Sequence, residues 1–106
     1  MRIGKEIKMP GYFSLDKHPD EEYAIGLEYK APDLESGETI VSGVVTIAPS
    51  GDEDDLVTKG SISVNDDSVS QVVEKGRSDV RYVVKFEATT SIGHVYVDKI
   101  FVNVKV

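Results

Sequence analysis

The sequence contains no cysteine and no tryptophan. Without cysteine the chain has no disulfide framework, no thiol nucleophile and no cysteine-ligated zinc or iron–sulfur site. The missing cysteines fit a reducing compartment. They also exclude the antibody subset of immunoglobulin domains, which needs a Cys…Trp…Cys core.

Basic residues are scarce, since 12 Lys and Arg stand against 19 Asp and Glu, a net charge of -7. This balance argues against binding to nucleic acid or to an anionic membrane surface. Charged residues break up the apolar residues of the first eight positions, so the N-terminus lacks the continuous hydrophobic region of a secretory signal peptide. No apolar run approaches the ~20 residues of a membrane span. We therefore expect that the chain has no signal peptide, does not associate with a membrane and acts in the cytoplasm.

The apolar residues that are present are mostly β-branched. Sixteen Val and eight Ile stand against four Leu and four Ala in 106 residues. β-Branched side chains are stiff at χ1 and pack well on pleated surfaces, whereas Leu and Ala favour helices. A chain of this length forms one domain, and its β-branched composition predicts that the domain is built from strands.

Alternation of apolar and polar residues locates the strands. No window has convincing helical spacing, so we expect no helix beyond a turn. Asp98-Lys99 disturbs the alternation of the last strand and predicts a bulge or register shift there. The predicted strands span residues 22–30, 39–48, 60–64, 69–73, 80–90 and 95–106.

Short strands at intervals of about ten residues are typical of an all-β antiparallel immunoglobulin-like β-sandwich of about seven strands, or of a small barrel. Tyr82 favours the sandwich, because it opens the penultimate strand where a tyrosine corner would bond to backbone a few residues upstream. We predict a domain over residues 15–106, preceded by an N-terminal arm or added strand over residues 1–14.

No candidate catalytic site emerges. The only histidines, His18 and His94, lie in predicted loops without a nucleophile elbow or triad pattern, so we interpret them as exposed loop residues and expect no enzyme. The acidic run from Asp52 to Asp55 is most simply a solvated loop tip. A calcium loop of Asp52, Asp54 and Asp55 is the alternative, although the spacing of an EF-hand is missing. We expect no cofactor.

Four apolar residues fall on the predicted outward face of the last two strands: Val83, Val95, Val97 and Phe101. Two interpretations stay open. They are ordinary apolar surface residues, or they form a patch that pairs with another subunit.

The order of several short motifs resembles a known family. The segment Lys17-His18-Pro19-Asp20-Glu21 is followed by Gly37-Glu38-Thr39-Ile40 and then by a closing hairpin that starts at Tyr82 and ends with Thr90-Ser91-Ile92-Gly93. This order is similar to small phage and prophage virion proteins called fiber-tail adaptor proteins, over about residues 15–106.

The resemblance implies a non-enzymatic immunoglobulin-like module that joins or decorates parts of a tailed particle. Its implied partners are other tail or connector proteins of the virion, or copies of itself, and its location is the host cytoplasm during assembly and then the virion. The alternative is an immunoglobulin-like binding module that recognises carbohydrate or a surface protein through its loops. That function would be supported by exposed loop aromatics, for which the sequence offers Tyr12 and Phe13.

Overall fold

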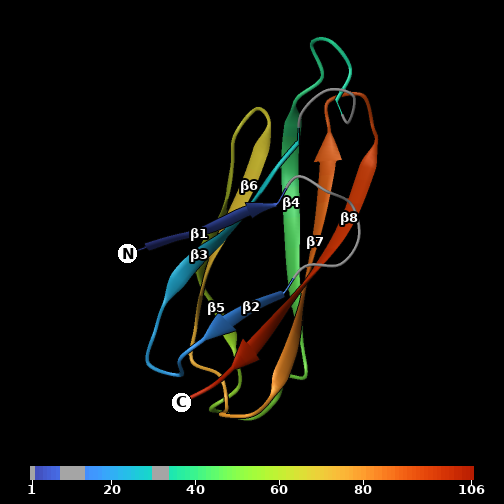
Figure 1. The fold of residues 1–106 in the computed structure, drawn as a ribbon. Coiled ribbons are helices and arrows are strands. Elements are labelled where there is room, and N and C mark those ends of the chain that lie inside the picture. The colour runs from blue at the N-terminus through green and yellow to red at the C-terminus, as the bar shows by residue number, and fades with distance from the viewer. Residues whose placement is uncertain (1, 8–13, 30–33) are drawn as a thin grey trace.

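The structure, a computed structural model, describes residues 2–7, 14–29 and 34–106 (Figure 1). These residues form eight strands and no helix, as the alternation predicts. Accordingly, no helix that could cross a membrane occurs in the described part of the chain. The strands are β1 (Arg2–Ile7), β2 (Ser14–Lys17), β3 (Tyr23–Glu28), β4 (Ile40–Ala48), β5 (Val57–Val64), β6 (Ser68–Glu74), β7 (Arg81–Thr90) and β8 (Val95–Val104).

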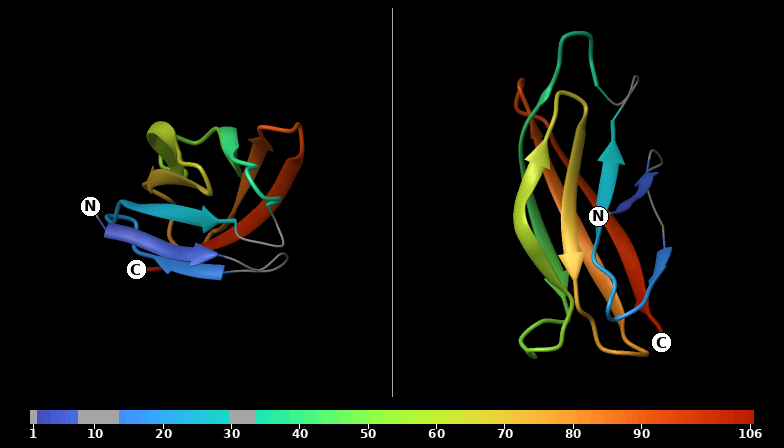
Figure 2. Two further views of the ribbon diagram at one scale, coloured as in Figure 1. Left: turned by 90° about the horizontal axis from the view of Figure 1, so that it is seen from above. Right: turned by 90° about the vertical axis from the view of Figure 1, so that its left-hand side faces the viewer.

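The strands form two four-stranded sheets that lie face to face. The first sheet has the order β1-β3-β6-β5 and the second the order β2-β8-β7-β4. Figure 2, right, shows the first sheet in front and β4, β7 and β8 behind it. The chain is therefore an all-β sandwich, and the fold class predicted from sequence is confirmed at this level.

The strand order can be compared with that of immunoglobulin domains. Orders β1-β3-β6-β5 and β8-β7-β4 correspond to the ABED and GFC orders of a constant-type sandwich, with β2 as an additional strand. Two pairings depart from an antiparallel sandwich, because β1 runs parallel to β3 and β2 runs parallel to β8. The immunoglobulin-like assignment stays a prediction.

Most predicted strands occur close to their predicted positions, and the differences lie near the N-terminus and in the middle. β2 was not predicted as a strand, and it crosses the expected boundary at residues 14 and 15. β5 begins at Val57, three residues before the predicted strand. The arm residues 8–13, including Tyr12 and Phe13, and the predicted strand end at Ala31-Pro32-Asp33 lie outside the described residues.

The predicted irregularity at Asp98-Lys99 is wrong. The register of β7 and β8 is continuous from Arg81 opposite Asn103 to Thr89 opposite Val95. Asp98 lies opposite Phe86 and so points to the inner face, where its Oδ2 accepts a hydrogen bond from the Tyr29 hydroxyl at 3.1 Å. A partnered inward carboxylate, not a bulge, interrupts the apolar alternation.

The core lies between the sheets and is built from alternate residues of the central strands. Tyr82 and Phe86 are its largest fully buried aromatic residues. Gly43 lets β4 approach β5 closely, because a Cβ atom there would lie 2.8 Å from Ile62 Cδ1. Other members of the core are Ile25, Leu27, Tyr29, Ile40, Leu56, Val69, Val73, Val84, Ala88, Ile100, Val102 and Val104.

A bulge interrupts the edge strand β5. The register with β6 shifts between Lys59 and Ser63, and Gly60 has a φ of 75°. The side chain of buried Gln71 donates hydrogen bonds to the carbonyl oxygens of Lys59 at 3.3 Å and Gly60 at 3.1 Å. The carbonyl groups at the bulge are thus hydrogen-bonded within the protein. A bulged edge strand is also a poor template for pairing with another strand.

Candidate functional site

The β4–β5 and β6–β7 connections meet at one end of the sandwich, at the bottom of Figure 1, and the Tyr82 side chain bonds to a residue of each. Its side chain is 0% exposed. Its hydroxyl accepts a hydrogen bond from the backbone N–H of Arg77 at 2.9 Å and donates one to Asp55 Oδ1 at 2.7 Å. A buried tyrosine bonded to backbone five residues upstream has the geometry of a tyrosine corner.

Asp55 corrects the interpretation of the acidic run. Asp52, Glu53 and Asp54 are exposed as expected, but Asp55 is buried. Its Oδ1 also accepts from Arg77 Nε at 2.8 Å, and its Oδ2 accepts from the backbone N–H of Asp52 at 3.1 Å. These bonds, first of all that from Arg77, hold the pKa of Asp55 below its usual value.

The candidate calcium residues Asp52, Asp54 and Asp55 do not form a cluster of possible metal ligands in the described part of the chain. Asp55 uses both carboxylate oxygens within the protein, and Asp52 Oδ1 accepts from the backbone N–H of Asp54 at 2.9 Å. Carboxylates that already accept protein hydrogen bonds are not preorganised for the six to eight oxygen ligands of Ca²⁺.

A reciprocal turn recurs in three loops, at residues 18–21, 35–38 and 52–55. In each loop the fourth residue donates its backbone N–H to the carbonyl oxygen of the first. Its carboxylate accepts the N–H of the first residue, at 2.8, 2.8 and 3.1 Å respectively. Local bonds of this kind fix a tight turn without help from the core. They explain why an acidic residue closes each loop.

Glu38 joins one of these turns to the β7–β8 hairpin at the other end of the sandwich. Its carboxylate is buried, and Oε2 lies 3.0 Å from Nδ1 of half-exposed His94. The Thr90 hydroxyl, the Glu35 amide and His94 all lower the pKa of Glu38, with Thr90 as the largest cause. Thr90 also accepts a hydrogen bond from the backbone N–H of His94 at 3.1 Å. The Gly37-Glu38 and Thr90-Ser91 motifs thus form one structural cluster.

The same cluster is the one metal-ligand arrangement among the described residues, with ligand atoms of Glu35, Glu38 and His94 within 4.8 Å of one another. Both oxygens of Glu38 already have protein partners. The arrangement therefore serves to join the turn to the hairpin. His18, the other histidine, accepts a hydrogen bond from the backbone N–H of Asp20 through Nδ1 at 3.0 Å in its own loop.

Lys17 anchors β2 to the β6–β7 connection. Its side chain is buried, and Nζ donates to the carbonyl oxygens of His18 and Lys75. Burial lowers the pKa of this ammonium, while Glu21 and Asp20 act in the opposite direction. Lys75 has a φ of 67°, which is rare for a residue with a side chain. Lys17, the first residue of the opening motif, therefore has a structural role.

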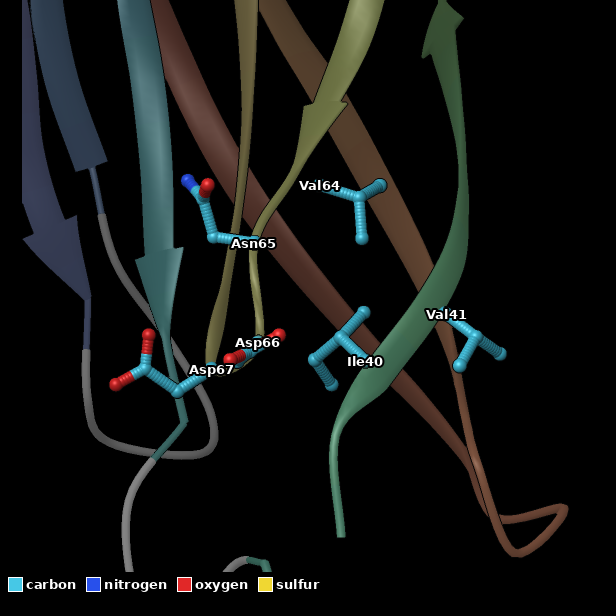
Figure 3. Close-up of a pocket in the computed structure, with 6 residues that line it drawn as sticks. All are labelled: Ile40, Val41, Val64, Asn65, Asp66 and Asp67. Carbon is cyan, nitrogen blue, oxygen red and sulfur yellow. The ribbon is translucent and has the colours of Figure 1, made fainter.

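A shallow pocket lies at the hairpin end, between the start of β4 and the β5–β6 turn (Figure 3). Figure 3 shows Asn65, Asp66 and Asp67 on one side of it and Ile40, Val41 and Val64 on the other. Among the residues that the structure describes, its lining is aliphatic and polar, without an aromatic side chain.

The four predicted interface residues all lie on one surface, which we call the outer face. It consists of the odd-numbered residues of β7 and β8 and the even-numbered residues 42–48 of β4, which point away from the other sheet. Val95 and Val97 are 56% and 53% exposed. Val83 and Phe101 are half-buried opposite one another, and the Arg81 guanidinium lies 4.3 Å from the Phe101 ring centroid.

One residue of the outer face was missed from the sequence. Val44 is 58% exposed and lies opposite Glu87, which in turn lies opposite Val97. The three side chains form one row across β4, β7 and β8. The alternation of β4 does place Val44 and Val45 on opposite faces, but only the pairing with β7 shows which of them faces outward.

The model of the family described as podophage GP4 fiber-tail adaptor protein gp77 matches residues 17–103. No curated protein matches. Among solved structures, a 2,6-sialyltransferase from Photobacterium sp. JT-ISH-224 has 17% identity and a TM-score of 0.45, over 91% of this chain and 18% of the enzyme. The family match covers nearly the whole sandwich, so the chain belongs to the podophage GP4 fiber-tail adaptor protein gp77 family.

Proposed function

We propose that the chain is a non-enzymatic structural module, with an immunoglobulin-like domain, that joins parts of a phage tail through protein–protein contacts of its outer face. Family membership supports a role as a structural component of a tailed particle. The partners would be other tail or connector proteins, met during assembly in the host cytoplasm and kept in the virion.

The observation that carries this proposal is the exposure of Val44, Val95 and Val97 on one side of a sheet. Val95 and Val97 are neighbours on the outward side of β8, and Val44 lies across Glu87 from Val97. Valines that are more than half exposed and gather on one face are typical of a docking surface. The fold is stabilised by the core and by the hydrogen-bonded clusters around Tyr82 and Glu38, none of which lies on the outer face. The outer face is thus available for contact without loss of the fold.

A small contact of this kind suffices within a particle. Many copies arranged by the particle convert weak individual contacts into strong attachment, because the second contact is effectively intramolecular. The C-terminal hairpin of β7 and β8 supplies most of the face, and the N-terminal strands are a further candidate contact element.

The test is to purify particles from a phage or prophage that encodes the chain and to quantify the chain by mass spectrometry. A deletion strain is then complemented with the wild-type chain, with Val97→Lys, or with Ser63→Lys as a matched control at an exposed position on β5. Lys at position 97 lies opposite Glu87, so the fold tolerates it. We expect Val97→Lys to be depleted from particles and Ser63→Lys to be incorporated normally.

Particles that lack the wild-type chain would overturn the structural role. Equal incorporation of both variants would overturn the assignment of the outer face.

A further inference from the structure

Two lysines lie directly opposite one another in the middle of the outer face. Lys85 of β7 pairs with Lys99 of β8, and Thr46 of β4 completes the row. Like charges at directly opposed positions of an antiparallel pair destabilise the sheet. The domain therefore keeps an arrangement that is unfavourable for the isolated chain.

Neutralisation of this pair within the chain is incomplete. Lys85 Nζ lies 3.4 Å from Glu87 Oε1, and both side chains are more than a third exposed. Lys99 is exposed and makes no ion pair in the described part of the chain. Over β4, β7 and β8 the outer face carries Arg81, Lys85 and Lys99 against Glu87 alone, which gives +2 on a chain of net charge -7.

The lysine row lies between two apolar rows. Val44 and Val97 are on one side of it, with Glu87 between them, and Val83 and Phe101 are on the other side. A polar group that approaches the two ammonium groups would therefore be surrounded by apolar side chains. Interfaces in which a charged contact lies within an apolar surround are well protected from water.

We propose that the partner at the outer face is a protein surface that places an Asp or Glu carboxylate between Lys85 and Lys99 and covers the exposed valines with apolar side chains. This inference rests on the proposed function and names the chemistry of the partner at that same face. A bridging carboxylate removes the repulsion between the two ammonium groups, so charge complementarity selects an acidic partner.

The same charges argue against a second copy placed face to face. A two-fold pairing of outer faces would bring two surfaces of charge +2 together, and like-charge contacts disfavour association. The isolated chain is thus expected not to dimerise through this face.

The test compares three forms of the full chain in the particle assay: the wild type, Lys85→Met/Lys99→Met, and Lys85→Arg/Lys99→Arg. Methionine keeps the apolar stem and removes the charge, whereas arginine keeps the charge. The control is Lys105→Met, since Lys105 follows β8 and contributes nothing to the row. Thermal melting of each purified chain is measured in parallel.

We expect the double methionine variant to melt at or above the wild-type temperature, because the like-charge pair is gone, and to be incorporated at least tenfold less. The arginine pair and Lys105→Met should stay within about twofold of wild-type incorporation. A carboxylate held between two cations is worth about tenfold or more in affinity.

The inference is overturned by normal incorporation of the methionine pair, by equal losses in the methionine and arginine pairs, or by a lower melting temperature of the methionine pair. Each of these leaves the wild-type chain in the particle. Absence of the wild-type chain would overturn the proposed function itself, so the two failures are distinguishable.

Discussion

Removing the Tyr82 hydroxyl is the sharpest perturbation of the fold. The hydroxyl of this fully buried residue makes two hydrogen bonds, one with the Arg77 amide at 2.9 Å and one with the Asp55 carboxylate at 2.7 Å. In Tyr82→Phe the ring still packs, but the amide loses an acceptor and the carboxylate loses a donor. A neutral hydrogen bond contributes about 1 kcal/mol and one to a charged group about 1.5–3 kcal/mol. We therefore expect Tyr82→Phe to cost about 3 kcal/mol.

Urea unfolding followed by circular dichroism measures this cost as a shift of the midpoint at unchanged slope. For a domain of this size the melting temperature should fall by roughly 12–20 °C. Combining the substitution with Asp55→Asn tests the partner, since the Tyr82 hydroxyl then bonds to a neutral amide oxygen in place of a carboxylate and the cost of Tyr82→Phe should be smaller. A cost below about 0.5 kcal/mol at the midpoint would refute the role of Tyr82 as the polar anchor of this end.

Two further predictions concern acid stability and glycine. The pKa values of Glu38 and Asp55 lie below their usual 4.5 and 3.8 in the folded chain, so the unfolded chain binds more protons in acid. The free energy of unfolding should be highest near neutral pH and should fall as the pH drops below about 5. The fall should be weaker in Glu38→Gln, which lacks one of the two carboxylates. A urea midpoint that stays constant down to pH 3 would contradict this prediction. Gly76→Ala should cost about 3 kcal/mol, because φ is 112° and the new Cβ would lie 2.7 Å from Val104 Cγ2. Gly51→Ala, at φ 111° with no atom within 4 Å, should cost only about 1 kcal/mol in the same melting assay, and equal costs would show that the contact with Val104 is unimportant.

Local patterns were sufficient for the strands that pair with close neighbours. β7 and β8 alternate strongly and are joined by a short turn, so both their limits and the outward position of Val95 and Val97 follow from the sequence. β2 could not be found in this way. It has only four residues, and its partner β8 lies at the far end of the chain, so its pairing depends on tertiary structure.

Burial of polar residues was the least predictable feature. Asp55 ends an acidic run that looks fully solvated, and its partners Arg77 and Tyr82 are 22 and 27 residues away. Asp98 led to the prediction of a bulge or register shift, because its hydrogen-bond partner Tyr29 is 69 residues away and is not apparent from the local sequence. In both cases a hydrogen bond from a distant residue, which no local pattern reveals, stabilises an inward carboxylate. The outward position of Val44 likewise depended on its pairing with β7.

Photo-crosslinking inside intact particles tests the central claim most directly. A photoreactive phenylalanine analogue replaces Val97 on the outer face or, in the control, Ser63 on β5, and cross-linked peptides from purified particles are identified by mass spectrometry. We predict that position 97 cross-links to another tail or connector protein at a peptide that contains Asp or Glu, and that position 63 does not. Cross-links from position 63 alone, or from position 97 only to β7 and β8 of a second copy, would contradict the account.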